Sequence, residues 1–178
     1  MKILPSDEGF LASTAHANII KPSFVATETE RKYLVNKEML PQLTGGEHII
    51  QAYLHISRQV TVRVRFTENS AFITVKGSQK GISRPEFEYP IPLEDAFFMA
   101  YELSPFAPVR KTRFQVIYCG KTWQIDEFEE QNAGLWVAEI ELSDPDEIFE
   151  LPPWIAEEVS GDSRYQNSTL AQKPFSEW

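Results

Sequence analysis

The sequence has almost no cysteine and no long hydrophobic run. Its 178 residues include a single cysteine, Cys119, so no disulfide can form within the chain. This composition fits the reducing cytoplasm, which is the location we predict. No apolar run approaches the roughly 18–20 residues of a membrane helix, so we expect no membrane partner. Because Cys119 alternates with apolar neighbours in QVIYCG, we interpret it as a core thiol.

Positive charge is also scarce. Lys and Arg total 17 against 26 Asp and Glu, and the net charge is −9. Nucleic acids are bound by basic faces, so we expect no nucleic-acid partner. A local basic pocket for a small polyanion remains compatible with this balance, because net charge averages over the whole surface. The sequence contains no Walker-type phosphate loop, no GxGxxG and no HExxH motif.

Short runs of alternating polar and apolar residues fill the chain from residue 26 onward. They predict an antiparallel meander of eight strands, over residues 27–35, 49–56, 60–66, 71–77, 84–91, 109–118, 121–128 and 135–143. Residues 67–70 and 119–121 are typical of hairpin turns. Helical pieces are expected over residues 36–43, 92–103, 143–150 and 162–172. We therefore expect an α+β domain over residues 25–178, preceded by a loosely ordered extension, residues 1–24.

Charged side chains share one face of most of these strands, because residues two apart point the same way. They form like-charged pairs: Arg63 with Arg65, Lys111 with Arg113, Glu86 with Glu88, and Glu139 with Glu141. An ordinary antiparallel sheet with its charged face in water is one interpretation. However, neighbouring like charges repel, and a solvent face usually mixes signs. The alternative is a closed eight-stranded barrel with a charged lumen, suited to phosphates and divalent metal.

These residues lie in motifs that resemble the CYTH superfamily, the triphosphate tunnel metalloenzymes. ETERK, residues 28–32, matches the ExExK signature, and QAYL, VRVR, TVKG, SRPEFEYPI, KTRF, IDEF and AEIEL follow in order. DSRYQNSTLA, residues 162–171, is similar to the C-terminal signature of the bacterial short-chain inorganic triphosphatase-like branch. The resemblance covers residues 26–173. It implies an eight-stranded antiparallel β-barrel that forms a tunnel, with a few surface helices and a C-terminal helix.

The resemblance also assigns the site residues. The acids expected to hold the cofactor, Mg²⁺ or Mn²⁺, are Glu28, Glu30, Asp126, Glu139 and Glu141. The bases expected to hold phosphate oxygens, and to act in catalysis with Glu28 and Glu30, are Lys32, Arg63, Arg65, Lys76, Lys111 and Arg113. Glu86 and Glu88 are assigned to orienting these bases or to a second metal. Arg164, and more weakly Lys173, are assigned to substrate contact from the final helix.

The function implied is metal-dependent hydrolysis of inorganic triphosphate, or of a related small-molecule triphosphate, and a homodimer is a further prediction. Three alternatives stay open. A class IV-type adenylate cyclase would make cyclic AMP from ATP, but we find no motif for recognising the base. A thiamine triphosphatase would use the same site. A non-catalytic polyphosphate-binding barrel would need the bases but not the complete set of acids.

Overall fold

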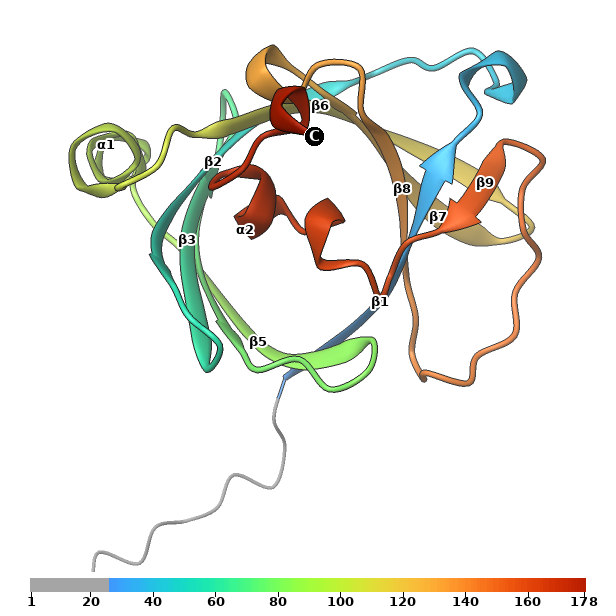
Figure 1. Ribbon diagram of the computed structural model, residues 1–178, viewed down its shortest axis with the longest axis horizontal. Helices are drawn as coiled ribbons and strands as arrows, with labels where there is room; N and C mark the ends of the chain where they lie inside the picture. The colour runs from blue at the N-terminus through green and yellow to red at the C-terminus, as the bar shows by residue number, and fades with distance from the viewer. Residues whose placement is uncertain (1–25) are drawn as a thin grey trace, which may run out of the picture.

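Eight antiparallel strands close into a barrel in the computed structural model, which describes residues 26–178 (Figure 1). The strands are β1 (Thr27–Val35), β2 (Glu47–Ile56), β3 (Val60–Phe66), β4 (Ala71–Gly77), β5 (Ser83–Pro90), β6 (Val109–Tyr118), β7 (Lys121–Phe128) and β8 (Trp136–Glu141). Their order is β5-β4-β3-β2-β6-β7-β8-β1, and pairing of β5 with β1 closes the ring. The predicted barrel is confirmed. The predicted extension, residues 1–24, lies outside the described residues.

A ninth strand, β9 (Ile155–Glu158), lies outside the ring and was not predicted. It pairs with the C-terminal part of β1, where Tyr33 lies opposite Glu158. The N-terminal part of β1 pairs instead with β5, at residues 27–29. The strand has only four residues, and its alternation is too short to distinguish from a loop. β1 therefore separates from β5 after Thr29, and β9 pairs with the remainder of β1.

The hydrophobic core lies mostly outside the barrel wall. One cluster contains Tyr33, Trp123 and Ile125 on the outer faces of β1 and β7, covered by Phe149 and Trp154 from the connection between β8 and β9. Because most inward residues of the strands are polar, the alternate outward residues must find apolar partners on the outside. This packing leaves the lumen free for charged side chains.

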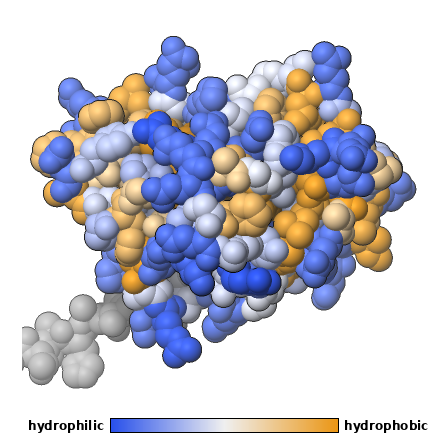
Figure 2. Space-filling model, turned by 45° about the horizontal axis from the view of Figure 1, so that its top comes forward, coloured by the Kyte–Doolittle hydropathy of each residue, from blue (hydrophilic) through white to orange (hydrophobic). Residues whose placement is uncertain are grey.

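A second cluster lies beneath the helix α1 (Leu93–Phe98), which a π-helix continues over Met99–Leu103. Ala96 and Ala100 pack there on Val64 and Ala52 of the barrel wall. The opposite side of the same helices is exposed and apolar, and hydrophobic surface is visible on this side of the molecule in Figure 2. Its exposed large apolar residues are Leu93, Phe97, Phe98, Tyr101 and Leu103. The homodimer stays a prediction.

The two predicted hairpin turns are present. Thr67 N–H donates to Ser70 O at 2.9 Å. In the other turn Cys119 and Gly120 have φ values of 46° and 77°, the left-handed pair that a two-residue hairpin requires. The prediction of a core thiol is wrong, because Cys119 occupies this turn and is exposed. Its Sγ donates to Glu150 Oε2 at 3.2 Å.

Helix was over-predicted in the loops. Residues 143–150 form turns, because the Ser143 N–H and hydroxyl both donate to Glu147 Oε2 at 2.7 Å and the Asp146 N–H donates to Asp144 Oδ1. Such side-chain bonds compete with helical ones. Residues 36–43 hold only a 3₁₀ turn at Lys37–Met39, which ends before Pro41.

The C-terminal helix is present but short. A 3₁₀ turn at Ser163–Tyr165 precedes α2 (Asn167–Leu170), and extended backbone at Gln166 separates them. In Figure 1 this segment lies across one opening of the ring. Among residues 26–178, no helix is long and apolar enough to cross a membrane.

Candidate functional site

The barrel encloses a cavity of about 480 Å³. Most of the predicted site residues line it: Glu28, Glu30, Lys32, Arg63, Arg65, Lys76, Glu86, Glu88, Lys111, Arg113, Glu139 and Glu141. They meet because each lies at an inward position of its strand, and the closed ring turns these positions toward one axis. Asp126 lies behind the lining, fully buried, and contacts two of its bases.

The charges are divided between two walls. Bases occupy β3 and β6, which lie on either side of β2 in the sheet. Acids dominate β1, β5 and β8, and β1 lies between β8 and β5. Since β2 and β1 are four strands apart in both directions round the ring, the basic wall faces the acidic wall across the lumen. A ligand with phosphates on one side and a cation on the other would match this division.

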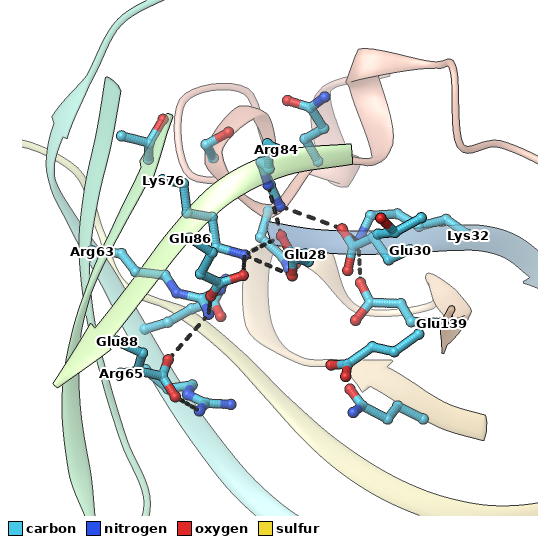
Figure 3. Close-up of a pocket in the computed structure, with 18 of the residues that line it drawn as sticks. Glu28, Glu30, Lys32, Arg63, Arg65, Lys76, Arg84, Glu86, Glu88 and Glu139 are labelled. Carbon is cyan, nitrogen blue, oxygen red and sulfur yellow. Dashed lines mark hydrogen bonds and ion pairs between the residues drawn. The ribbon is translucent and has the colours of Figure 1, made fainter. Parts of the chain in front are cut away.

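On the β1–β5 side, Glu28 is held by two cations. Lys76 Nζ contacts its carboxylate at 2.9 Å and Arg84 Nε at 2.7 Å. Figure 3 shows Lys76, Arg84, Glu28 and Glu86 converging. Burial alone would raise the pKa of Glu28, but Lys76 and Arg84 outweigh it and hold that pKa well below its ordinary value. Glu28 is therefore an ionised carboxylate at any physiological pH.

A second group joins β1 to β8. Lys32 forms ion pairs with Glu139 and, at 3.1 Å, with Glu30. Arg113 Nη2 donates to the other oxygen of Glu139 at 2.7 Å. Burial would lower the pKa of Lys32, but Glu139 and Glu30 more than offset it and raise that pKa. Lys32 thus keeps its charge inside the lumen.

The third group lies beneath β6. Asp126 accepts from Lys111 Nζ at 2.5 Å and from Arg113 at 2.6 Å and 2.7 Å, and none of its surface is exposed. Burial and the neighbouring Arg113 lower the pKa of Lys111 to about 8, despite the contact with Asp126. Both oxygens of Asp126 are engaged in orienting bases. Its role as a metal ligand stays a prediction.

Glu141 differs from the other acids. It lies directly opposite Glu30 in the register of β1 and β8, and it forms no ion pair within the described residues. Burial, and then the neighbouring Glu28 and Glu30, raise the pKa of Glu141. No group of three or more candidate ligand side chains is gathered closely enough for a metal among residues 26–178. Nevertheless, facing carboxylates with excess negative charge are the donor type that a hard divalent cation requires.

Several lining residues were missed. Arg84 contacts Glu28 and, at 3.4 Å, Glu30. It shares inward parity with Glu86 and Glu88, so the alternation that selected those acids was sufficient to find it. Gln51 and Tyr53 of β2 line the cavity as well, but neutral residues gave no charge signal.

The C-terminal segment closes one mouth of the barrel. Leu170 packs on Val109, Phe128 and Val137, in a buried apolar cluster at this end. Across the same mouth, Gln166 Nε2 donates to Gln79 Oε1, in the connection between β4 and β5, at 3.1 Å. Residues 166–168 therefore line the cavity, whereas the predicted Arg164 is exposed and pairs with Asp162 outside it. A substrate contact by Arg164 stays a prediction, and so does one by Lys173.

A family model for the CYTH domain matches residues 26–174. The chain belongs to the CYTH domain family. This CYTH chain is 39% identical over 148 residues to a protein named inorganic triphosphatase from Acetivibrio thermocellus, covering 83% of this chain and 95% of the relative. It is 34% identical over 152 residues to an inorganic triphosphatase from Nitrosomonas europaea, covering 82% and 97%.

Solved structures share the fold of this CYTH chain. A crystal structure described as an inorganic triphosphatase matches with a TM-score of 0.60 and 29% identity, over 81% of this chain and 93% of that one. A protein from Pyrococcus horikoshii matches with a TM-score of 0.51 and 21% identity, over 67% and 81%. The second likeness concerns the fold alone.

Proposed function

We propose that the protein is an inorganic triphosphatase that hydrolyses its substrate inside the charged barrel. The observation that carries the proposal is the division of the lumen into a basic wall and an acidic wall, in a chain whose curated relatives are inorganic triphosphatases. Arg63 and Arg65 supply fixed positive charge for the phosphate oxygens, and Lys111 adds a further positive charge below its pKa of about 8. Because the lumen is buried, these charges act more strongly on developing negative charge than they would in water.

We further propose that activity depends on Mg²⁺ or Mn²⁺. Glu30 and Glu141 lie opposite each other on β1 and β8, Glu141 forms no ion pair within the described residues, and Glu28 is the next carboxylate on β1. These three are the residues that we assign to the metal. A divalent cation here would spread the negative charge of the phosphate oxygens during transfer to water. The residues of the opposite wall bind and orient the triphosphate, and the closed mouth excludes bulk water from one end.

A lyase acting on ATP would need a surface that recognises the adenine. Residues 166–168 and Leu142 line the cavity beside the charged groups, but no aromatic side chain other than Tyr53 is among the lining residues within the described chain. This arrangement favours the hydrolase over the adenylate cyclase. Thiamine triphosphate also carries aromatic rings, so the scarcity of aromatic lining residues favours inorganic triphosphate over it as well.

A substrate panel tests the proposal. Inorganic triphosphate, thiamine triphosphate, ATP and longer polyphosphate are each incubated with Mg²⁺ or Mn²⁺, and orthophosphate and cyclic AMP are measured separately. We expect orthophosphate from inorganic triphosphate at the highest kcat/KM, no cyclic AMP, and no reaction with a chelator. Arg63→Ala should lower kcat/KM by about 100-fold or more, as the loss of a transition-state donor does elsewhere. Cyclic AMP as the main product, or binding without turnover, would refute it.

A further inference from the structure

The strand β2 contributes the neutral part of the basic wall. Its inward residues Gln51 and Tyr53 lie directly opposite Arg65 and Arg63 of β3 in the sheet register. On its other side, β2 pairs with β6, where Ile49 lies opposite Lys111. Gln51 itself lies opposite Val109 of β6 and diagonal to Lys111, so it lies on the strand between those that carry the two basic pairs. A polyanion that contacts both pairs spans β2, the strand that carries this side chain.

Gln51 is also incompletely satisfied. Its side chain is fully buried and lines the cavity. Its Nε2 donates to Tyr53 Oη at 3.1 Å, but Oε1 has no hydrogen-bond partner among the described residues. An unpaired buried acceptor costs about 1–3 kcal/mol. Buried amides in native proteins rarely keep such a cost without a functional reason.

A half-turn of the amide resolves the missing contact. Tyr53 Oη accepts from Gln51 in the present arrangement, so the hydroxyl proton is free for another acceptor. Burial raises the pKa of Tyr53, so the hydroxyl keeps this proton at neutral pH. After the turn, Oε1 accepts the Tyr53 proton and the NH₂ group takes the buried position on the cavity lining that Oε1 now occupies. The lumen then gains a neutral donor between Arg65 and Lys111.

We propose that Gln51 is a substrate-contacting residue, whose amide turns on Tyr53 and donates its NH₂ group to a phosphate oxygen held between the two basic pairs. This inference rests on the proposed function, because it takes a triphosphate as the ligand. Phosphate oxygens accept hydrogen bonds, so only the turned amide suits them. The contact adds directional binding at the centre of the wall without adding charge.

Two substitutions at Gln51 test the contact. Gln51→Met keeps the length and removes both polar groups, and we expect KM for inorganic triphosphate to rise about tenfold or more, with a smaller change in kcat. Gln51→Glu keeps an acceptor for Tyr53 but replaces the donor with negative charge, and KM should rise further. Gln42→Met, on the exposed surface, is the matched control. A merely structural role would lower the folded fraction and leave KM unchanged.

The wild-type protein provides a second readout that does not depend on the variants folding. The side-chain NH₂ signals of Gln51, assigned by their loss in Gln51→Glu, are followed by NMR during titration with inorganic triphosphate without divalent metal. We expect them to shift and to saturate together with the thermal stabilisation of the protein. If the protein is stabilised but these signals and the KM of both variants stay unchanged, the inference is wrong. If the wild type is neither stabilised nor active, the proposed function has failed.

Discussion

At the scale of single residues, the lumen is an array of buried charges that stabilise one another. Glu28, Glu139 and Asp126 stay ionised because each contacts at least one buried cation. Breaking such a pair leaves an uncompensated charge and costs more than the pair contributes. Glu141 is the exception, since the charged groups that shift its pKa most are the carboxylates of Glu28 and Glu30. This difference makes Glu141 the position where substitution separates metal binding from folding.

Replacing Glu141 with Gln should change stability and metal binding in opposite directions. The raised pKa of Glu141 means that its ionised form is disfavoured in the folded protein, so stability is lost as pH rises through that pKa. Glu141→Gln should therefore keep or raise the melting temperature without metal, while the Mg²⁺ concentration for half-maximal activity rises at least about tenfold. Thermal melts with and without metal measure both effects.

The exposed Glu68→Gln is the control for Glu141→Gln, and it should leave both quantities unchanged. An unaltered Mg²⁺ requirement in Glu141→Gln would remove Glu141 from the metal site.

Lys111 should couple substrate binding to proton uptake. Its pKa is about 8 in the free protein, so the amine is largely neutral above that pH. A bound polyanion favours the ammonium form and raises the pKa, so binding at about pH 9 takes up a proton at this group. Calorimetry with inorganic triphosphate, without divalent metal and in two buffers of different protonation enthalpy, measures the uptake.

Lys111→Arg is the reference for this coupling, because a guanidinium is charged in both states. The wild type should take up more protons than this variant, by up to about one per site. Equal uptake by the two proteins would show that Lys111 does not change its charge when the ligand binds.

At the scale of elements, the strands, the two hairpin turns and the helix at Leu93–Phe98 were predictable, whereas the loop at residues 143–150 and the C-terminal segment were not. Period-two alternation is a local property, so residues 60–66 or 121–128 carry their own signal for a strand and for its inward face. Residues 143–150 carry a helical start signal that their own carboxylates divert into turns. Likewise residues 166–168 line the cavity only because α2 packs at the barrel mouth, and no local sequence pattern predicts that contact.

Removing the Leu170 side chain should destabilise the closed mouth. Leu170 is 1% exposed and packs on Val109, Phe128 and Val137. Leu170→Ala should therefore lower the free energy of unfolding by about 2–5 kcal/mol, through lost burial and a cavity. Urea denaturation measures this. Leu151→Ala, at a side chain that is 55% exposed, should change it by no more than about 0.5 kcal/mol.

If Leu170→Ala were as stable as the wild type, the C-terminal segment would not be a fixed closure of the barrel.

At the scale of the whole molecule, the fold inverts the usual arrangement of a globular protein. The apolar clusters lie outside the ring and at one mouth, and the interior holds charges. The segregation of like charges on the predicted strands was enough to indicate this arrangement, because it made little sense for a solvent face. The importance of neutral Gln51 required the closed structure, since it comes from neighbours distant in sequence.

The most direct test of hydrolysis in this lumen is a phosphorus NMR time course of inorganic triphosphate with the wild-type protein and Mg²⁺ or Mn²⁺. We expect conversion to orthophosphate and pyrophosphate in equal amounts, no conversion after chelation of the metal, and at least a 100-fold slower conversion by Arg63→Ala. Persistence of the triphosphate signals with folded wild-type protein and either metal would contradict the central claim that this lumen hydrolyses triphosphate.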